Sequence, residues 1–144
     1  MTGVFIELIS IIFFPFLYSS LWANYNNLTD LATIDSFVNI SFEKPDFIAW
    51  LDVSFNQIQH ISNELLSLTN LKILYLHGNK IQFLIEVGKL KSLKKLKTLT
   101  LHGNPVENIP NYRLHVIKLI PQLTNLDFSV ISRDERIAGK NKLR

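Results

Sequence analysis

The sequence predicts an α/β solenoid, in which short parallel strands form a curved horseshoe and helical or 3₁₀ segments form its convex side. Two observations predict this class: a five-position pattern of apolar residues and asparagine recurs four times in 144 residues, and the apolar spacing widens between the copies. A hydrophobic content of 47% with 19% charged residues excludes a disordered chain. The length suits a single domain.

The repeated pattern is L-x-x-L-x-L-x-x-N-x-L, with conservative apolar replacements, at residues 18–28, 48–58, 71–81 and 96–106. In the central L-x-L, both apolar residues point to one face of a strand and the x residues point to the other face. The asparagine then turns inward and satisfies backbone groups where the chain leaves the strand. We assign this structural ladder to Asn26, Asn56, Asn79 and Asn104.

Between the strands, apolar residues follow one another at steps of three and four, as in residues 58–68 and 81–93. These steps indicate helical or 3₁₀ turns on the convex side. A single coil cannot bury its own leucines, so neighbouring coils must supply the other half of the core. The four repeats therefore form one unit, residues 18–104.

Residues 105–138 are predicted to close the last layer of the core. Apolar residues from Tyr112 to Ile120 mark one face of a helix, and a half-repeat through Leu123, Leu126 and Phe128 follows without its asparagine. The residues 132–135, Ser-Arg-Asp-Glu, have the form of a capping box and predict the start of a final helix. Residues 139–144 form a basic tail.

Residues 18 to about 138 resemble the short-repeat leucine-rich repeat family, of the 22-residue type with a C-terminal cap. The resemblance rests on Ala-Trp-Leu-Asp-Val-Ser-Phe-Asn at 49–56, Leu-Tyr-Leu-His-Gly-Asn at 74–79 and Leu-Thr-Leu-His-Gly-Asn-Pro at 99–105. It also rests on Asp-Glu-Arg at 134–136 in the cap. The resemblance implies a cytoplasmic, non-enzymatic protein of ciliated cells.

Residues 1–17 form an apolar segment that departs from the polar leader expected of that family. We interpret it as a flap over the first core layer or as a start that is not the natural one. The alternative is a secreted or membrane-anchored recognition domain that uses residues 1–20 as a signal or anchor. Against a signal, no lysine or arginine precedes the apolar run, and the nearest cleavage triplet begins with Tyr18.

The x positions of the strands place both tryptophans and Tyr75 on the concave face instead of in the core. Exposed aromatic side chains are common anchors of interfaces, so we predict a protein-interaction module that binds a protein partner on this face. The alternative is an intramolecular cover by the first long loop or the N-terminal segment. The predicted contact residues are Trp22, Trp50, Asp52, Tyr75, His77, Thr100, His102 and Asp127.

Metal and cofactor sites are not predicted. The chain has no cysteine, and a zinc site needs three or four protein ligands, whereas only His77 and His102 fall at neighbouring positions. His60 and His115 have no evident companions. Ser54, His77 and Asp52 are near one another in the pattern, but no nucleophile elbow surrounds the serine, so we expect no enzyme activity.

Nucleic acid is not an expected partner either. Five lysines between Lys89 and Lys97 alternate with inward-pointing leucines, which is typical of a solvated convex face. Binding of a nucleic acid strand would need basic residues interleaved with stacking aromatics, and here these occupy different faces. We expect a monomer, with a membrane contact only if the N-terminal segment is an anchor.

Overall fold

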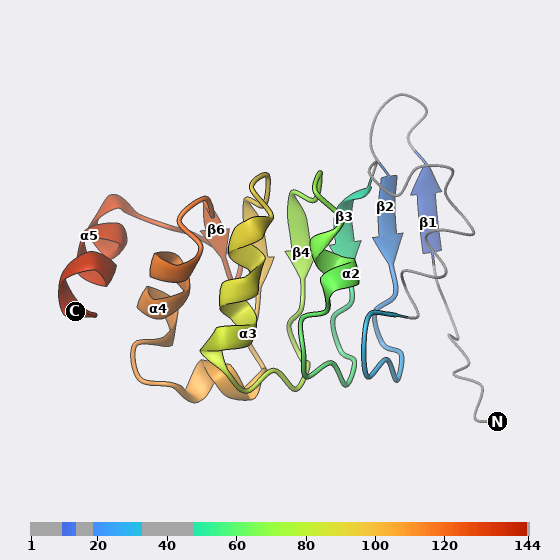
Figure 1. The fold of residues 1–144 in the computed structure, drawn as a ribbon, viewed down its shortest axis with the longest axis horizontal. Coiled ribbons are helices and arrows are strands. Elements are labelled where there is room, and N and C mark those ends of the chain that lie inside the picture. Colours follow the sequence, from blue (N-terminus) through green and yellow to red (C-terminus); the bar gives the residue numbers. More distant parts are fainter. Residues whose placement is uncertain (1–9, 14–18, 33–47, 144) are drawn as a thin grey trace.

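The computed structural model describes residues 10–13, 19–32 and 48–143. In this part of the chain, strands form one sheet in the order of the sequence, and helices cover one of its faces (Figure 1). The strands are β1 (Ser10–Phe13), β2 (Ser19–Trp22), β3 (Ile48–Asp52), β4 (Ile73–Tyr75), β5 (Thr98–Thr100), β6 (Asn125–Leu126) and β7 (Ser129–Val130). The helical segments are α2 (Asn63–Leu66), α3 (Leu84–Lys89), η2 (Leu90–Ser92), η3 (Pro105–Asn108), α4 (Tyr112–Leu119) and α5 (Arg133–Lys142).

Strands β2 to β6 are parallel, as the repeats predict, and equivalent residues of adjacent repeats lie side by side. Leu51, for example, pairs with Leu74, and Leu74 with Leu99. The solenoid class predicted from the sequence is thus confirmed, with α2, α3 and the two 3₁₀ helices η2 and η3 as the helical side.

The sheet also has an antiparallel strand at each end, which the repeat pattern does not predict. Strand β1 comes from the apolar N-terminal segment and pairs with β2, while β7 forms a hairpin with β6. The other residues of the predicted segment 1–17 lie outside the described residues, as do positions 33–47 of the first loop.

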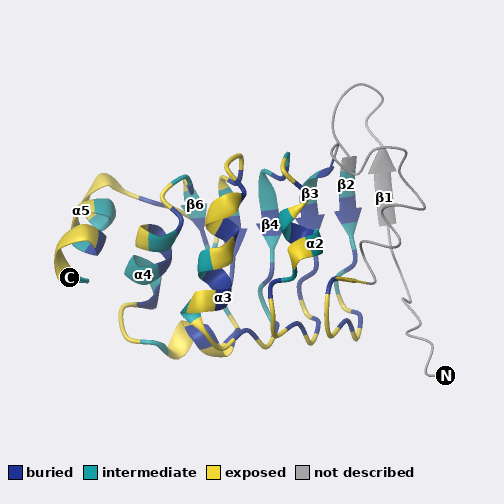
Figure 2. Ribbon diagram, viewed as in Figure 1, coloured by how far each residue is buried: buried dark blue, intermediate teal, exposed yellow. Residues whose placement is uncertain are grey.

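The core lies between the sheet and the helical side (Figure 2). It is formed by the inward residues of each strand and by the apolar residues of the convex turns, as in Leu51, Leu74, Leu90, Leu99 and Val116, which are fully buried. The lysines between Lys89 and Lys97 are exposed, while the leucines between them are buried, as predicted. Among the described helices, none is long and apolar enough to span a bilayer.

The asparagine ladder joins each repeat to the one before it. The Asn79 amide nitrogen donates to the carbonyls of Leu76 (2.9 Å) and of Val53 in the preceding repeat (3.0 Å), and its Oδ1 accepts from the Ile58 amide (3.0 Å). Asn56 and Asn104 make the equivalent bonds in their repeats. Asn26 donates to carbonyls of its own repeat.

The C-terminal cap holds the end of the sheet with polar contacts. The Arg113 guanidinium donates to Glu135 (Nε–Oε1 2.6 Å) and to the Leu126 carbonyl (2.8 Å), and so links α4, α5 and β6. The predicted capping box is present: the Glu135 amide donates to Ser132 Oγ, and the Ser132 amide donates to the Glu135 carboxylate.

Convex turns of adjacent repeats are joined by Glu86. Its buried carboxylate accepts from the Ile61 amide (2.8 Å) and from Lys89 Nζ (2.8 Å), and it lies 3.6 Å from His60 Nδ1. The expectation that His60 has no companion was therefore wrong, because the turn of the following repeat brings Glu86 beside it.

Substituting Asn79→Ala should destabilise the fold by about 3 kcal/mol, because buried backbone groups of two repeats lose their partners together. Urea unfolding of the purified chain measures the change. Asn141→Ala, at an exposed position of α5, is the matched control and should change the free energy by less than about 0.5 kcal/mol. Equal effects of the two substitutions would contradict the ladder argument.

Acid should weaken the cap through Glu135. Hydrogen bonds from Arg113 and the Ser132 amide hold the pKa of the Glu135 carboxyl below its ordinary value of 4.5. A lowered folded-state pKa contributes stability that is present above 4.5 and is lost as the pH falls through the folded value. Glu135→Gln should therefore lower the melting temperature at neutral pH and differ progressively less from wild type below pH 4.5. Thermal unfolding from neutral pH to below pH 4.5 measures the difference in melting temperature between the two chains. A difference that does not change with pH would contradict the role of the Glu135 carboxylate.

Candidate functional site

The sheet face opposite the helices, here called the open face, carries the side chains that alternate with the core leucines. Leu21, Leu51 and Leu74 are fully buried, whereas Trp22 and Tyr75 on the opposite side are only half-buried. Trp50 and Asp52 are half-buried as well. These four predicted contact residues therefore lie together on one surface, at neighbouring positions of β2, β3 and β4.

One row of aromatic rings runs across the open face along the middle of the strands. Trp22 meets Trp50 edge to face, with ring centroids 5.7 Å apart, and Trp50 meets Tyr75 in the same way at 5.7 Å. Tyr75 then contacts Phe128 at 5.4 Å. Edge-to-face contacts at these distances are favourable beyond the area that they bury, so the row is held in a fixed arrangement.

A second row of rings follows the ends of the same strands. Tyr25 stacks on Phe55 at 4.5 Å, Phe55 meets the edge of His77 at 5.1 Å, and His77 stacks on His102 at 4.7 Å. Phe128 contacts both histidines at 5.7 Å and joins this row to the first. The two rows together are called the aromatic surface: Trp22, Tyr25, Trp50, Phe55, Tyr75, His77, His102 and Phe128.

The two histidines are neighbours, as their equivalent repeat positions predict. Burial, and then the nearby His102 ring, lower the pKa of His77, whose Nδ1 shares a hydrogen bond of 2.7 Å with Thr100 Oγ1. Within the described ranges, no group of three residues of the metal-binding types comes together.

Thr100 is not a contact residue, and this prediction was wrong. Its side chain faces the open side, but it is 0% exposed and is bonded to His77, so it supports the ring above it. The prediction took every x position of a strand to be accessible, whereas the neighbouring rings here cover the small threonine.

Asp127 is also held by its own chain. Its Oδ1 accepts from the Leu101 and His102 amides (2.6 and 2.9 Å), and its Oδ2 accepts from the Tyr112 hydroxyl (2.9 Å). A continued parallel strand would offer a backbone carbonyl at this place, as Thr100 does for the Leu76 amide. Asp127 therefore ends the run of parallel strands, because its carboxylate takes the place of a backbone carbonyl. It also lies 3.4 Å from His102 Nδ1, although the pattern placed it in another column.

Phe128 reaches the open face because the chain reverses after Leu126. Asp127 and Phe128 both have left-handed backbone angles, with φ of 50° and 61°. The half-repeat pattern placed Phe128 in the core, and the structure shows it 61% exposed. The missing asparagine of this half-repeat was the signal that the strand does not continue as the others do.

Tyr25 and Phe55 were also missed. They precede the ladder asparagines, at the position that Gly78 and Gly103 occupy in the later repeats. All four have left-handed backbone, with φ between 54° and 71°, which glycine adopts freely and aromatic residues rarely do. The left-handed backbone lowers stability at Tyr25 and Phe55, and their side chains are 69% and 43% exposed. Aromatic residues at these positions therefore indicate a role other than stability.

Ser54 does not have the geometry of a nucleophile. It is buried, and its hydroxyl donates to Asp52 Oδ1 at 2.7 Å instead of to a histidine nitrogen. The bond fixes the Asp52 carboxylate within the open face. Trp50 Nε1 is buried and has no acceptor among the residues that the structure describes.

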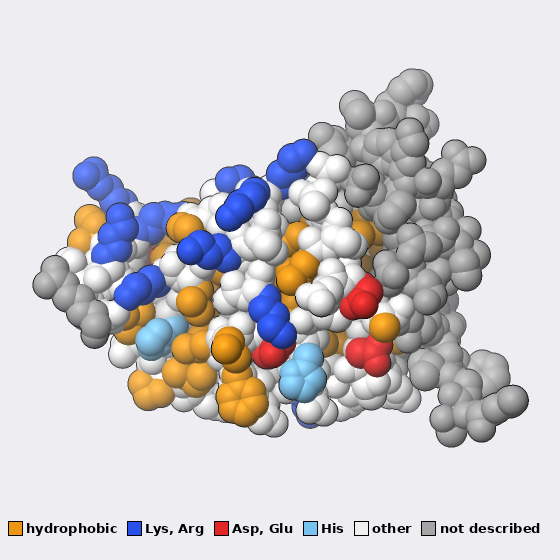
Figure 3. Space-filling model, in the orientation of Figure 1, with side chains coloured by type: hydrophobic (Ala, Val, Ile, Leu, Met, Phe, Trp, Pro, Cys, Tyr) orange, Lys and Arg blue, Asp and Glu red, His pale blue; other side chains and the backbone are white. Residues whose placement is uncertain are grey.

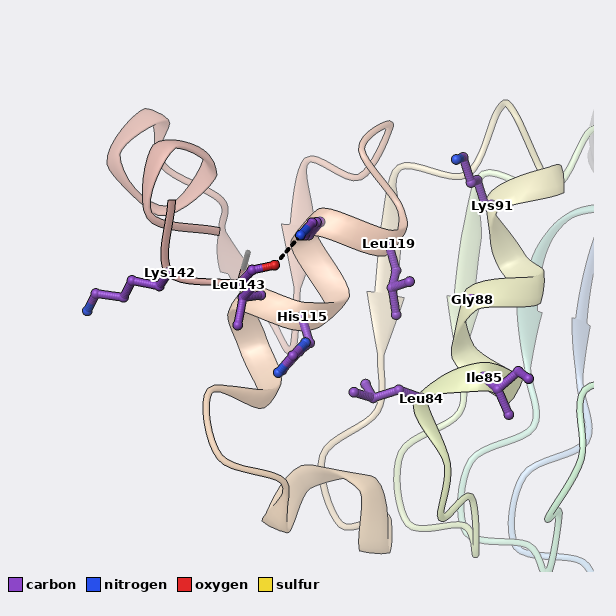
Figure 4. A pocket seen from close by; sticks show the side chains of 9 residues that line it. Leu84, Ile85, Gly88, Lys91, His115, Leu119, Lys142 and Leu143 are labelled. Carbon is purple, nitrogen blue, oxygen red and sulfur yellow. Dashed lines mark hydrogen bonds between the residues drawn. The ribbon is translucent and has the colours of Figure 1, made fainter. Parts of the chain in front are cut away.

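The helical side carries a separate feature, a groove of about 750 Å³ between α3 and α4. Lysines and arginines gather over this side of the molecule, next to apolar side chains (Figure 3). Leu84 and Leu119 extend into the groove, and Lys91 and Lys142 lie at its rim (Figure 4). His115 lines it as well, and none of the predicted contact residues does.

Gly78→Ala should destabilise the fold by about 2 kcal/mol, partly through its left-handed backbone. The added Cβ would also lie 2.7 Å from Phe55 Cδ1. In a Phe55→Gly background, the ring is absent and the cost should fall to about 1 kcal/mol. Chemical unfolding of the four chains measures this cycle. An equal cost in both backgrounds would show that Gly78 does not make room for the ring.

The comparisons with known proteins agree with this architecture. The family model described as "Leucine-rich repeat" matches residues 27–144. Leucine-rich repeat-containing protein 51 of Bos taurus is 46% identical over 121 residues, which is 84% of this chain and 63% of that protein. The Homo sapiens protein of that name is 43% identical, over 86% of this chain and 65% of its own length. The chain thus spans slightly less than two thirds of these curated relatives.

Solved structures share the fold. A chain of the Drosophila melanogaster SNF/U2A' complex superposes with a TM-score of 0.65 at 35% identity, over 69% of this chain and 57% of that one. The Mex67 LRR domain from Chaetomium thermophilum superposes with a TM-score of 0.58 at 27% identity, over 73% and 76%. The family match over most of the chain and the similar solved structures support a protein-interaction module. The chain belongs to the leucine-rich repeat family.

Proposed function

We propose that this chain is a non-enzymatic scaffold that binds a protein partner on its open face, the concave face of the predicted horseshoe. The observation that carries the proposal is the aromatic surface, in which eight rings from consecutive repeats contact one another. Aromatic side chains in a packed, partly exposed cluster are the usual anchors of protein interfaces.

The aromatic surface is preorganised for binding. Its rings are fixed by mutual contacts, by the bond between His77 and Thr100, and by the strands beneath them. Association therefore orders few side chains, and less of the binding energy is lost to entropy. Phe128 and Tyr25 are the most exposed members, so they are the side chains that a partner reaches first.

The related structures support a protein as the partner. One is the structure of the SNF/U2A' complex, and another is the structure of Chaetomium Mex67:Mtr2 subunits. We further propose that the chain acts in the cytoplasm of ciliated cells, as the resemblance to its family implies, and that it acts as a monomer. The competing proposal of a secreted or anchored recognition domain depends on residues 1–20, of which only 10–13, 19 and 20 are described.

Phe128→Ala should weaken partner binding by about tenfold or more, as expected when an exposed aromatic anchor of an interface is removed. The measurement is quantitative affinity capture from the cytoplasmic extract of ciliated cells, with wild type and variant compared for each recovered protein. Phe83→Ala is the matched control, because Phe83 is 59% exposed but precedes α3 on the helical side.

A partner that is lost with Phe128→Ala and retained with Phe83→Ala supports the proposal. Recovery that is unchanged by Phe128→Ala would contradict it, and would favour an intramolecular segment as the cover of the aromatic surface. Phe128 and Phe83 are both largely exposed, so each variant should remain folded and melt close to wild type, and circular dichroism checks this.

A further inference from the structure

Asp52 lies among three aromatic side chains on the open face. In the register of the sheet it pairs with Trp22 on one side and with Tyr75 on the other. Trp50 precedes it by two residues on the same strand and face, with its ring at 88° to Trp22 and at 75° to Tyr75. The three rings thus border one carboxylate. This group of four residues is called the Asp52 cluster.

The charge of Asp52 is not compensated within the described part of the chain. Its Oδ1 accepts from the Ser54 amide (2.9 Å) and hydroxyl (2.7 Å), both neutral donors. No donor reaches its Oδ2 and no lysine, arginine or histidine forms an ion pair with it among the described residues. Burial, and then the Asp52 charge, raise the pKa of the Tyr75 hydroxyl. A half-buried carboxylate without a cation is costly.

Basic side chains are also missing from the outward positions of the neighbouring strands on the open face. The chain has a net charge of +3, yet its lysines and arginines avoid the outward positions of strands β2 to β6. The charged side chain at those positions is the carboxylate of Asp52. Asp127 follows β6, and its carboxylate is already bonded by the Leu101 amide and the Tyr112 hydroxyl. Asp52 thus offers a partner a carboxylate that no cation of the described residues pairs with and that aromatic rings border.

An aromatic ring attracts a cation to its face, and a carboxylate binds a cationic donor strongly. A guanidinium combines both contacts better than an ammonium, since it is planar, stacks on rings and is weakly hydrated. We propose that the Asp52 cluster binds the guanidinium of an arginine side chain presented by the protein partner. This inference rests on the proposed function and names the chemistry by which that same face recognises its partner.

Both tryptophans of the chain belong to the cluster, so intrinsic fluorescence reports on this site. The probes are three acetylated and amidated tripeptides with glycine on either side of arginine, lysine or citrulline. Citrulline has nearly the shape of arginine without the charge. The arginine peptide should change the fluorescence saturably, and the citrulline peptide should bind about tenfold more weakly.

Asp52→Asn tests the carboxylate, because the amide oxygen still accepts from Ser54. In this variant the preference for arginine over citrulline should disappear. Asp134→Asn removes an equal charge from an exposed position of α5 and should leave the preference unchanged. Nuclear Overhauser contacts between arginine side-chain protons and indole protons of the wild-type chain provide a readout that does not depend on a variant.

Four results would overturn the inference: no saturable response to the arginine peptide, equal binding of the citrulline peptide, equal binding of the lysine peptide, or an unchanged preference in a folded Asp52→Asn chain. Each leaves the capture experiment with Phe128→Ala untouched, so the proposed function can hold while this inference fails. Conversely, if the arginine peptide binds at Asp52 but Phe128→Ala loses no partner, the arginine site holds and the proposed role of the aromatic surface in partner binding fails.

Discussion

The structure depends on the hydrogen bonds that the ladder asparagines make where each strand ends. The few backbone hydrogen bonds between short parallel strands do not hold adjacent repeats together by themselves. The chain also turns out of the sheet where each strand ends, and the backbone groups of that turn need partners. The asparagine side chain satisfies carbonyls of two repeats and one amide, as Asn79 does. Each repeat is thereby fixed to the one before it, and the leucines of adjacent repeats meet in one core.

The position before each asparagine follows from the same turn. The turn needs a left-handed residue, which glycine supplies in the third and fourth repeats at Gly78 and Gly103. In the first two repeats aromatic residues take this conformation, and the space above Gly78 is filled by the Phe55 ring. The asparagine ladder therefore positions the second aromatic row. The left-handed backbone at Tyr25 and Phe55 costs folding free energy, and the asparagine hydrogen bonds of the same repeats offset this cost.

Much of this could be predicted from the sequence, because the leucine spacing is local and repeated. The leucine and asparagine pattern located the strands β2 to β6 and the asparagine ladder. The apolar spacing after Asn104 located the helix at Tyr112, and Ser132 and Glu135 located the capping box. The sequence did not reveal the antiparallel strands β1 and β7, because they pair with the first and last strands of the repeats and have no repeat pattern of their own. Phe128 and Thr100 were misplaced for a related reason: accessibility depends on neighbouring rings and on a reversal at Asp127, which a single repeat does not encode.

The charge distribution separates the two sides of the molecule. On the helical side, Lys89 is paired with Glu86, and the remaining lysines between Lys91 and Lys97 keep the convex turns solvated beside an apolar groove. On the open face the fixed rings border Asp52, whose carboxylate is held in place by the Ser54 amide and hydroxyl. Under the arginine proposal, the open face attracts a partner that presents a cation, and the lysines of the helical side repel it. The proposal thus links partner choice to docking side in a chain of net charge +3, because the lysines and arginines of the described residues avoid the outward strand positions of the face that the asparagine ladder makes rigid.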